Sequence, residues 1–227
     1  MHRVGRGRRS YALGAAVLAL VVAVPLDGSV NRLTARYLDS HEFRLVANGF
    51  TALGTFWAGG GMLAALALVG QRTADAALVR ASLGGLAGIV LGGVAGYVVK
   101  QATCRARPRV MRAEEVAAAR VGFASFFFRW PCLTASRYQS FPSGHANTAF
   151  ALASALIAAA PGRRRLWLGV AGGVAASRLL VNAHFLSDVL AGGLLGWAAG
   201  QAGQAVAGRF SAGARPVAGT VPRGAQP

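Results

Sequence analysis

Residues 81–99, ASLGGLAGIVLGGVAGYVV, form an uncharged apolar run that ends directly before Lys100, the only lysine of the chain. A helix of this length can cross the hydrocarbon core of a bilayer. Five further apolar segments flank it, and the shorter ones need neighbouring residues to span a membrane. These segments are Tyr11–Leu26, Phe50–Gly70, His145–Ala160, Leu166–Val181 and Val189–Gly208. Because lipid offers no partner to backbone polar groups, the sequence predicts an all-α integral membrane protein, a bundle of six transmembrane helices.

The composition of the chain also indicates a membrane protein. Of its 227 residues, 54% are hydrophobic and 14% are charged, and a soluble domain of this size would carry more charge. The formal net charge of +17 would fit a nucleic-acid-binding protein, but the arginines cluster at the ends of the apolar runs. We therefore expect the lipid bilayer as a partner and no nucleic acid.

The arginines of the short connections set the expected orientation. Four of them precede the first apolar segment, as in a signal peptide, but no small-residue cleavage site follows, so we expect a retained first helix. The positive-inside rule places these and the other loop arginines in the cytoplasm. They are Arg3, Arg6, Arg8, Arg9, Arg72, Arg80, Arg163, Arg164, Arg165, Arg209, Arg215 and Arg223. We expect a multi-pass protein of the bacterial cytoplasmic membrane with both termini in the cytoplasm.

The expected organisation along the chain has three parts. Residues 1–10 form a basic cytoplasmic N-terminus, residues 11–208 the six-helix membrane domain, and residues 209–227 a disordered cytoplasmic tail rich in Gly, Ala and Pro. Within the membrane domain, Asn31–Gly49 mixes polar and apolar residues and is expected to lie as an interfacial helix.

Three short polar motifs interrupt the apolar pattern. One follows the third helix, one opens the fourth, and one joins the fifth to the sixth, so the expected topology brings all of them to the outer membrane face. They are Lys100-x6-Arg107-Pro108, Pro142-Ser143-Gly144-His145 and Ser177-Arg178-x5-His184-x3-Asp188. The topology rests on hydropathy and loop charge alone, and this convergence therefore independently indicates an active site at the extracytoplasmic face.

The motifs contain residue types that bind a phosphoryl group. Charge that develops on the non-bridging oxygens must be met by fixed donors, and Lys100, Arg107 and Arg178 can supply them. Ser143 is a good N-cap, and Gly144 removes side-chain bulk at a helix N-terminus, where backbone N–H groups bind phosphate well. Taken alone, this part of the second motif also fits an ordinary capped helix.

The third motif pairs an imidazole with a carboxylate. His184 and Asp188 lie four residues apart, one turn apart if the segment is helical. A carboxylate that accepts one ring N–H fixes the tautomer and leaves the other nitrogen free to attack. Asp188 is also the only acid within the late apolar segments, which marks it as a functional candidate, although a buried structural pair is the alternative. His2 and His41 lie outside the motifs and are expected to be surface groups.

Together the three motifs resemble the tripartite signature of the type 2 phosphatidic acid phosphatase superfamily, in its membrane branch, over residues 100–188. The resemblance implies that His184 is a nucleophile that forms a phosphohistidine, that Asp188 orients it, and that His145 protonates the leaving oxygen. It implies no metal and no cofactor, since cations take the place of a metal. The implied phosphate-binding residues are Lys100, Arg107, Ser143, Gly144 and Arg178. Pro108, Pro142 and Ser177 belong to the motifs without a definite implied role.

The implied function is that of a metal-independent phosphatase acting on a membrane lipid phosphate or diphosphate at the outer leaflet. The substrate would be a polyprenyl diphosphate, phosphatidylglycerophosphate, phosphatidic acid or a lipid A phosphate, and the sequence does not choose among them. A lipid phosphotransferase that passes the phosphoryl group to an acceptor lipid would have the same motifs. Vanadium haloperoxidases share them but are soluble and larger, whereas a non-catalytic binder of anionic headgroups would not need His184 and Asp188.

Two further patterns leave alternatives open. Glycines at four-residue spacing in the third and sixth helices either pack inside the bundle or form a homodimer seam. Cys104 and Cys132 lie in the same loop, and they either pair in an oxidising compartment or remain free thiols. The glycines are Gly84, Gly88, Gly92, Gly96, Gly192, Gly196 and Gly200.

Overall fold

The computed structural model describes residues 2–36, 40–111 and 135–213. Within these residues the chain forms seven α-helices and no β-strand, so the all-α prediction is confirmed. The α-helices are α1 (His2–Ala35), α2 (His41–Leu53), α3 (Phe56–Arg72), α4 (Ala76–Thr103), α6 (Gly144–Ala159), α7 (Arg164–Leu180) and α8 (Leu186–Gly213). Short 3-10 helices are η1 (Pro108–Val110), η3 (Ser136–Tyr138) and η4 (Pro161–Arg163).

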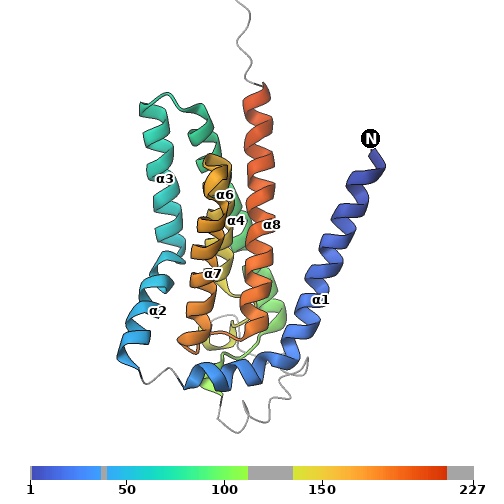
Figure 1. Cartoon of the computed structure of the whole chain (residues 1–227), viewed down its shortest axis with the longest axis vertical. Helices are drawn as coiled ribbons and strands as arrows, with labels where there is room; N and C mark the ends of the chain where they lie inside the picture. Colours follow the sequence, from blue (N-terminus) through green and yellow to red (C-terminus); the bar gives the residue numbers. More distant parts are fainter. Residues whose placement is uncertain (1, 37–39, 112–134, 214–227) are drawn as a thin grey trace, which may run out of the picture.

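Helices α4, α6 and α8 pack against one another and form the centre of the bundle. Helix α3 packs on α4, α7 on α6, α2 on α7, and α1 on α8. Figure 1 shows that the second half of α1 turns across one end of the bundle, the end at which α4 ends and α6 and α8 begin. Pro25 lies inside α1, and a proline in a helix interior removes a hydrogen bond and bends the helix. We call this end of the bundle the motif end.

Long apolar helices mark the chain as a membrane protein. Among the described residues, two helical stretches are long and apolar enough to cross a bilayer, Val17–Ala35 and Ala76–Val110. The pair α2 and α3, bent by 53° at their break, adds a third if it is counted as one span. Helices α6 and α7 have only 16 and 17 residues, fewer than the roughly 20 that a straight span needs.

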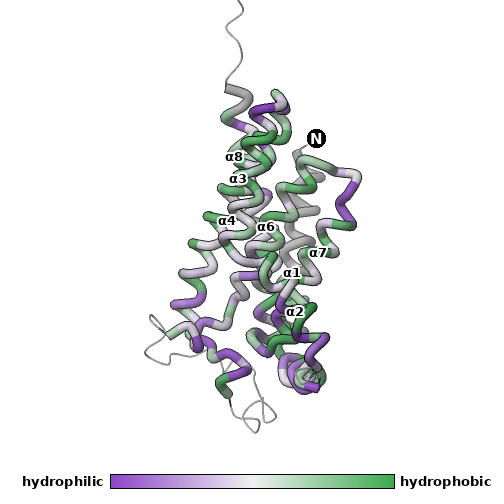
Figure 2. The backbone as a smooth tube through the Cα atoms, turned by 90° about the vertical axis from the view of Figure 1, so that its left-hand side faces the viewer, coloured by the Kyte–Doolittle hydropathy of each residue, from purple (hydrophilic) through white to green (hydrophobic). Residues whose placement is uncertain are grey.

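The outer surface of the bundle is apolar. Figure 2 shows white to green colour along most of the helical length, with purple mainly toward the two ends. Large apolar side chains on α1, α3 and α4 are exposed, among them Leu18, Trp57, Leu68 and Val94. Extended exposed apolar surface of this kind is characteristic of contact with a membrane.

The glycine stripes pack inside the bundle. A Cβ added at Gly196 of α8 would lie 2.1 Å from the backbone oxygen of Asn147 on α6. One at Gly192 would lie 2.3 Å from the backbone oxygen of Ser143, and one at Gly88 of α4 would lie 2.7 Å from the backbone of α8. Because only glycine permits these approaches, the stripes serve packing between α4, α6 and α8, and the faces that they form are occupied within one chain.

The apolar run Phe50–Gly70 is broken into two helices, a feature that hydropathy alone does not predict. Helix α2 ends before Gly54, where an added Cβ would lie 2.4 Å from Cγ1 of Val174 on α7. Thr55 then caps α3 by accepting a hydrogen bond from the Ala58 N–H at 3.2 Å. The break thus lies where the chain packs tightly against α7, and the 53° bend between α2 and α3 occurs there.

The ends of two predicted segments also differ. The stretch Asn31–Gly49, expected to be one interfacial helix, is divided between the end of α1 and the start of α2, and residues 37–39 lie outside the described residues. Helix α8 continues to Gly213, five residues beyond the predicted end of the membrane domain. The rest of the expected tail, residues 214–227, lies outside the described residues.

Candidate active site

Helix α4 ends in a left-handed turn at the motif end. Cys104 follows its last residue with φ 44° and ψ 37°, a conformation that is uncommon for residues other than glycine. The Cys104 N–H donates to the carbonyl oxygen of Lys100 at 2.9 Å, which closes the last turn of the helix. Cys104 is disulfide-bonded rather than a free thiol, and the other cysteine of the chain, Cys132, lies outside the described residues.

Lys100 connects the end of α4 to the segment that precedes α6. Its ammonium donates to the carbonyl oxygen of Gln139 at 3.0 Å and also to that of Pro142. These contacts occupy two of the three N–H donors of a lysine. The half-buried ammonium is thereby fixed next to the second motif.

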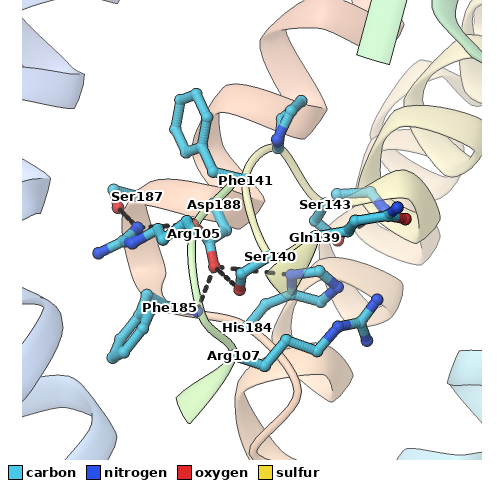
Figure 3. Close-up of polar contacts among 12 residues, drawn as sticks. Arg105, Arg107, Gln139, Ser140, Phe141, Ser143, His184, Phe185, Ser187 and Asp188 are labelled. Carbon is cyan, nitrogen blue, oxygen red and sulfur yellow. Dashed lines mark hydrogen bonds and ion pairs between the residues drawn. The ribbon is translucent and has the colours of Figure 1, made fainter. Parts of the chain in front are cut away.

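Arg107 is held through both its backbone and its side chain. Its N–H donates to the carbonyl oxygen of Arg137 at 2.9 Å, and its Nε donates to that of Ser136 at 3.0 Å. Figure 3 shows the Arg107 guanidinium beside the His184 ring, on the side away from Asp188. Pro108 is buried and begins η1, so its place in the structure is in the turn that follows Arg107.

The second motif forms the N-terminus of α6. Ser143 is buried, and its hydroxyl accepts a hydrogen bond from the Ala146 N–H at 3.5 Å, so it is the predicted N-cap. Gly144 is exposed, and beyond its chain neighbours and the backbone of its own helix no heavy atom lies within 4 Å of the position that a Cβ would take there. The positive end of the helix dipole therefore borders open space, where an anion can bind. Pro142, directly before this cap, is joined to Phe141 by a cis peptide bond.

His145 lies in the first turn of α6 and is half-buried. It interacts electrostatically with the second histidine and with three cations of the other motifs. These groups are His184, Arg178, Arg107 and Lys100. The structure thus brings the predicted acid near the predicted nucleophile and the phosphate-binding cations.

His184 lies in the connection between α7 and α8 and is 2% exposed. The preceding Asn182 has φ 51°, a left-handed conformation that asparagine tolerates. The Nδ1 atom of His184 lies 3.6 Å from Oδ2 of Asp188, just beyond hydrogen-bonding distance, and has no hydrogen-bond partner among the described residues. The imidazole and the carboxylate therefore face each other without forming a hydrogen bond (Figure 3).

Burial lowers the pKa of His184 to about 4. The carboxylate of Asp188 opposes this shift, whereas the positive charges of Arg107 and Lys100 add to it. The imidazole is therefore neutral at neutral pH, and a neutral imidazole has a ring nitrogen with a free lone pair.

Asp188 is fully buried in the first turn of α8 and accepts hydrogen bonds from three donors. Arg105 donates to Oδ1 at 2.6 Å, while the hydroxyl of Ser140 and the N–H of Phe185 donate to Oδ2 at 2.5 and 2.8 Å. Figure 3 shows the carboxylate between Arg105 and His184. With this many donors, the carboxylate has a fixed orientation toward the imidazole.

Arg178 lies at the end of α7 and is 6% exposed. Its Nη1 donates to the hydroxyl of Thr51 on α2 at 2.9 Å, and its Nε is buried without a hydrogen-bond partner in the described part of the chain. Its carbonyl oxygen accepts from the N–H groups of Ala183 and His184 at 3.1 and 3.3 Å. Arg178 thus holds the connection between α7 and α8 that contains His184, which we call the histidine loop. Its Nε–H donor has no partner in the described part of the chain.

Ser177 contacts α2 and its own helix rather than the imidazole. Its hydroxyl donates to the carbonyl oxygen of Val174 at 2.7 Å and lies 3.0 Å from the hydroxyl of Thr51. His41, expected at the surface, is exposed. Three residues that sequence reasoning missed are important for the site: Arg105, Ser140 and Asp27, the last of which bonds Arg105 from α1. The one available signal was for Asp27, an acid that directly follows the first apolar segment, Tyr11–Leu26.

Taken together, the described residues form a site for an anion. A neutral buried imidazole, the exposed N-terminus of α6 and the cations from α4, α7 and the segment after α4 lie at the same end of the bundle. Such a cationic surround attracts an anion such as phosphate. The chemistry that this set can perform is attack of a ring nitrogen on a bound phosphoryl group.

Comparison with known proteins places this site within a family. No curated protein and no solved structure matches the chain. A sequence model of the PAP2 superfamily matches residues 82–209, more than half of the chain, and this range includes all three motifs. Members of this superfamily are phosphatases that act on phosphate esters. The chain therefore belongs to the PAP2 superfamily, the type 2 phosphatidic acid phosphatases.

Proposed function

We propose that this protein is a metal-independent phosphatase that removes a phosphoryl group from a membrane lipid phosphate or diphosphate through a phosphohistidine on His184. The observation that carries the proposal is the environment of His184. Its ring is buried and neutral, faces Asp188 on one side, and has Arg107 on the other. A neutral imidazole backed by a carboxylate and placed next to phosphate-binding donors is a suitable nucleophile for phosphorus.

In the first step, Nε2 of His184 attacks the phosphorus and the bond to the leaving oxygen breaks. The positive charge that develops on the ring is stabilised by Asp188, and the 3.6 Å separation of Nδ1 and Oδ2 has to shorten to about 2.7–3.2 Å. His145, which takes up a proton together with the bound phosphate anion, gives this proton to the leaving oxygen and becomes neutral. Lys100, Arg107 and Arg178 stabilise the negative charge on the non-bridging oxygens.

In the second step, neutral His145 takes a proton from water, and the hydroxide attacks the phosphohistidine. The P–N bond breaks, inorganic phosphate is released, and the imidazole of His184 is neutral again. We propose that the water enters beside Gly144, which is exposed and has open space next to its Cα. The cations perform the charge stabilisation that a metal supplies in other phosphatases.

A lipid substrate is supported by the apolar outer surface of the bundle. We propose six membrane passes, in which α2 and α3 form one bent span and the shorter α6 and α7 are extended by flanking residues. Figure 1 supports this arrangement, since α1 and α8 have their outer ends on the side opposite to the motif end. With the arginine-rich connections in the cytoplasm of a bacterial cell, the site would face the exterior or periplasm.

Phosphate release from a panel of lipid phosphates tests the proposal. The purified protein in detergent micelles, with a chelator present, is compared with His184→Ala on polyprenyl diphosphate, phosphatidylglycerophosphate, phosphatidic acid and lipid A phosphate. We expect release by the wild type from at least one substrate and none by the variant. Wild-type protein denatured under mild alkaline conditions during turnover should carry a covalently bound phosphoryl group. This group should be lost in acid, as a phosphohistidine requires.

Two outcomes would contradict the proposal. Equal release by His184→Ala would exclude the phosphohistidine route. Loss of activity in chelator, restored by Mg²⁺, would exclude the metal-independent route. Release that needs an added acceptor lipid, with the phosphoryl group recovered on that lipid, would instead establish the phosphotransferase.

A further inference from the structure

A buried ionic network lies behind the proposed nucleophile and reaches into α1. Arg105 donates to Oδ2 of Asp27 and to Oδ1 of Asp188, both at 2.6 Å. The side chains of all three residues are 0% exposed. Burying a charge is costly unless it is paired and hydrogen-bonded, so the three groups depend on one another. The guanidinium also lies over the Phe185 ring at 4.3 Å, which fixes its plane.

Asp27 additionally holds the start of α8. Its Oδ1 accepts the backbone N–H of Ser187 at 2.8 Å, and its Oδ2 accepts the Ser187 hydroxyl at 2.6 Å. The first N–H groups of a helix lack partners within the helix, so Asp27 acts as a cap supplied by another helix. Because Ser187 directly precedes Asp188, this cap positions the carboxylate that faces His184.

A second contact from α1 holds the other side of the histidine loop. Asn31 lies one helical turn after Asp27, on the same face of α1, and donates to Oδ1 of Asn182 at 2.6 Å. Asp27 and Asn31 thus contact Ser187 and Asn182, which lie on either side of His184 in the sequence. Asp27 and Asn31 belong to α1, which lies outside the family-matched residues 82–209.

The charges of the network give Asp27 a further role. Arg105 alone would neutralise Asp188, and a neutral pair would stabilise a positively charged imidazole poorly. With Asp27 present, one cation lies between two carboxylates, and the formal net charge is −1. The second carboxylate therefore leaves Asp188 with an effective negative charge toward His184.

We infer that Asp27 is a positioning residue of the active site: through Arg105 and Ser187 it fixes the Asp188 carboxylate against His184 and preserves its negative charge. This inference rests on the proposed function for its kinetic consequences. Asp27 itself bonds only Arg105 and Ser187 among the described residues and acts through them.

The test uses the charge of the network in full-length protein. Asp27→Asn keeps the shape of the side chain and brings the net charge to zero, and we expect kcat to fall about 10- to 100-fold with little change in KM. The double variant Asp27→Asn/Arg105→Gln returns the net charge to −1 and keeps an amide donor near Asp188. We expect it to recover about tenfold in kcat over Asp27→Asn. Ser29→Ala, on the exposed side of α1, is the control and should retain wild-type kcat.

A merely structural role of Asp27 predicts a different pattern. The yield of folded protein, measured by size-exclusion chromatography in detergent, would then fall in both Asp27→Asn and Asp27→Asn/Arg105→Gln. The kcat per folded molecule would stay at the wild-type value. That result would overturn the inference, as would a double variant no more active than Asp27→Asn.

Orthovanadate binding gives a readout that does not need turnover. Vanadate adopts the five-coordinate geometry of the transition state and would bond His184 directly. We expect calorimetry to show binding about tenfold weaker in Asp27→Asn than in wild type, with partial recovery in the double variant. Equal vanadate affinity in all three proteins would overturn the inference about Asp27. A wild type that binds vanadate but releases no phosphate from any lipid would overturn only the proposed function.

Discussion

The backbone N–H of Ser143 donates a hydrogen bond to the carbonyl oxygen of Asp188 at 2.9 Å. This bond joins the cap of α6 to the first turn of α8, so the second motif, Pro142–His145, and the third motif, Ser177–Asp188, are held together directly. Its length depends on how closely the two helices approach, and Gly192 on α8 permits that approach.

Gly192→Ala should therefore disrupt the site by pushing the N-terminus of α6 away from α8. The new Cβ would lie 2.3 Å from the backbone oxygen of Ser143, so α6 and α8 must separate. We expect a loss of about 1–3 kcal/mol in unfolding free energy and about 100-fold in kcat/KM, measured by thermal unfolding and phosphate release. Gly93→Ala is the matched control, since no heavy atom lies within 4 Å of its Cβ position. Similar losses in both variants would show that close packing at Gly192 is not the cause.

Thr51→Val should weaken phosphate binding through Arg178. The hydroxyl of Thr51 is the described partner of the Arg178 guanidinium, at 2.9 Å, and valine keeps the shape of the side chain but not the oxygen. We expect kcat/KM to fall about tenfold, with Thr51→Ser close to wild type because it keeps the hydroxyl. The control is Thr73→Val, at the C-cap of α3 and away from Arg178. An equal fall in kcat/KM in this variant would point to a general effect on the bundle.

The pH dependence of kcat/KM should reveal the buried state of His184. Because its pKa is lowered to about 4, the imidazole stays neutral and nucleophilic well below pH 6.5, where an unperturbed histidine becomes protonated. We expect the acidic limb of the profile near pH 4, and a limb near pH 6.5 would contradict it.

The same shift predicts how stability depends on pH. Between about pH 6.5 and 4 the unfolded chain binds a proton at residue 184 that the folded protein does not, so stability should fall as the pH falls through this window. A series of thermal unfolding curves measures this slope. The slope should be smaller in His184→Gln, which cannot take up the proton.

Lys100→Arg should not preserve activity, although it preserves charge. The compact ammonium bonds two carbonyl oxygens, those of Gln139 and Pro142, and a planar guanidinium cannot reproduce both contacts from the same position. We expect kcat/KM to fall about tenfold or more, equivalent to about 1.4 kcal/mol of transition-state stabilisation. Arg80→Lys, exposed and near the start of α4, makes the reverse exchange away from the site and should be silent. A fully active Lys100→Arg would show that only its charge matters.

The motif residues and their meeting at one end of the bundle could be predicted, because hydropathy fixes where the chain reverses and the motifs lie at those reversals. The supporting residues could not. Arg105 occupies a variable position of the first motif, and nothing in its spacing distinguishes it from its neighbours. Asp27 contacts Ser187, 160 residues away, and its only signal in the sequence was a negative charge directly after the apolar segment Tyr11–Leu26.

Other parts of the fold depend on tertiary contacts that hydropathy does not contain. The run Phe50–Gly70 reads as one helix, yet the packing of Gly54 against Val174 divides it. Thr51 is an ordinary residue of that run, and its partnership with Arg178 arises from the way α2 lies on α7. The sequence was enough to propose the reacting groups but not to identify the groups that hold them in place.

The contribution of α1 and α2 has a consequence for how this protein can be recombined with its relatives. Residues 82–209 carry the family signature, but Asp27, Asn31 and Thr51 reach the site from outside that range. A chimera that exchanged the signature segment alone would set a foreign loop against these three side chains. To transfer substrate specificity between this protein and a relative, α1 and α2 should therefore be exchanged together with the signature segment.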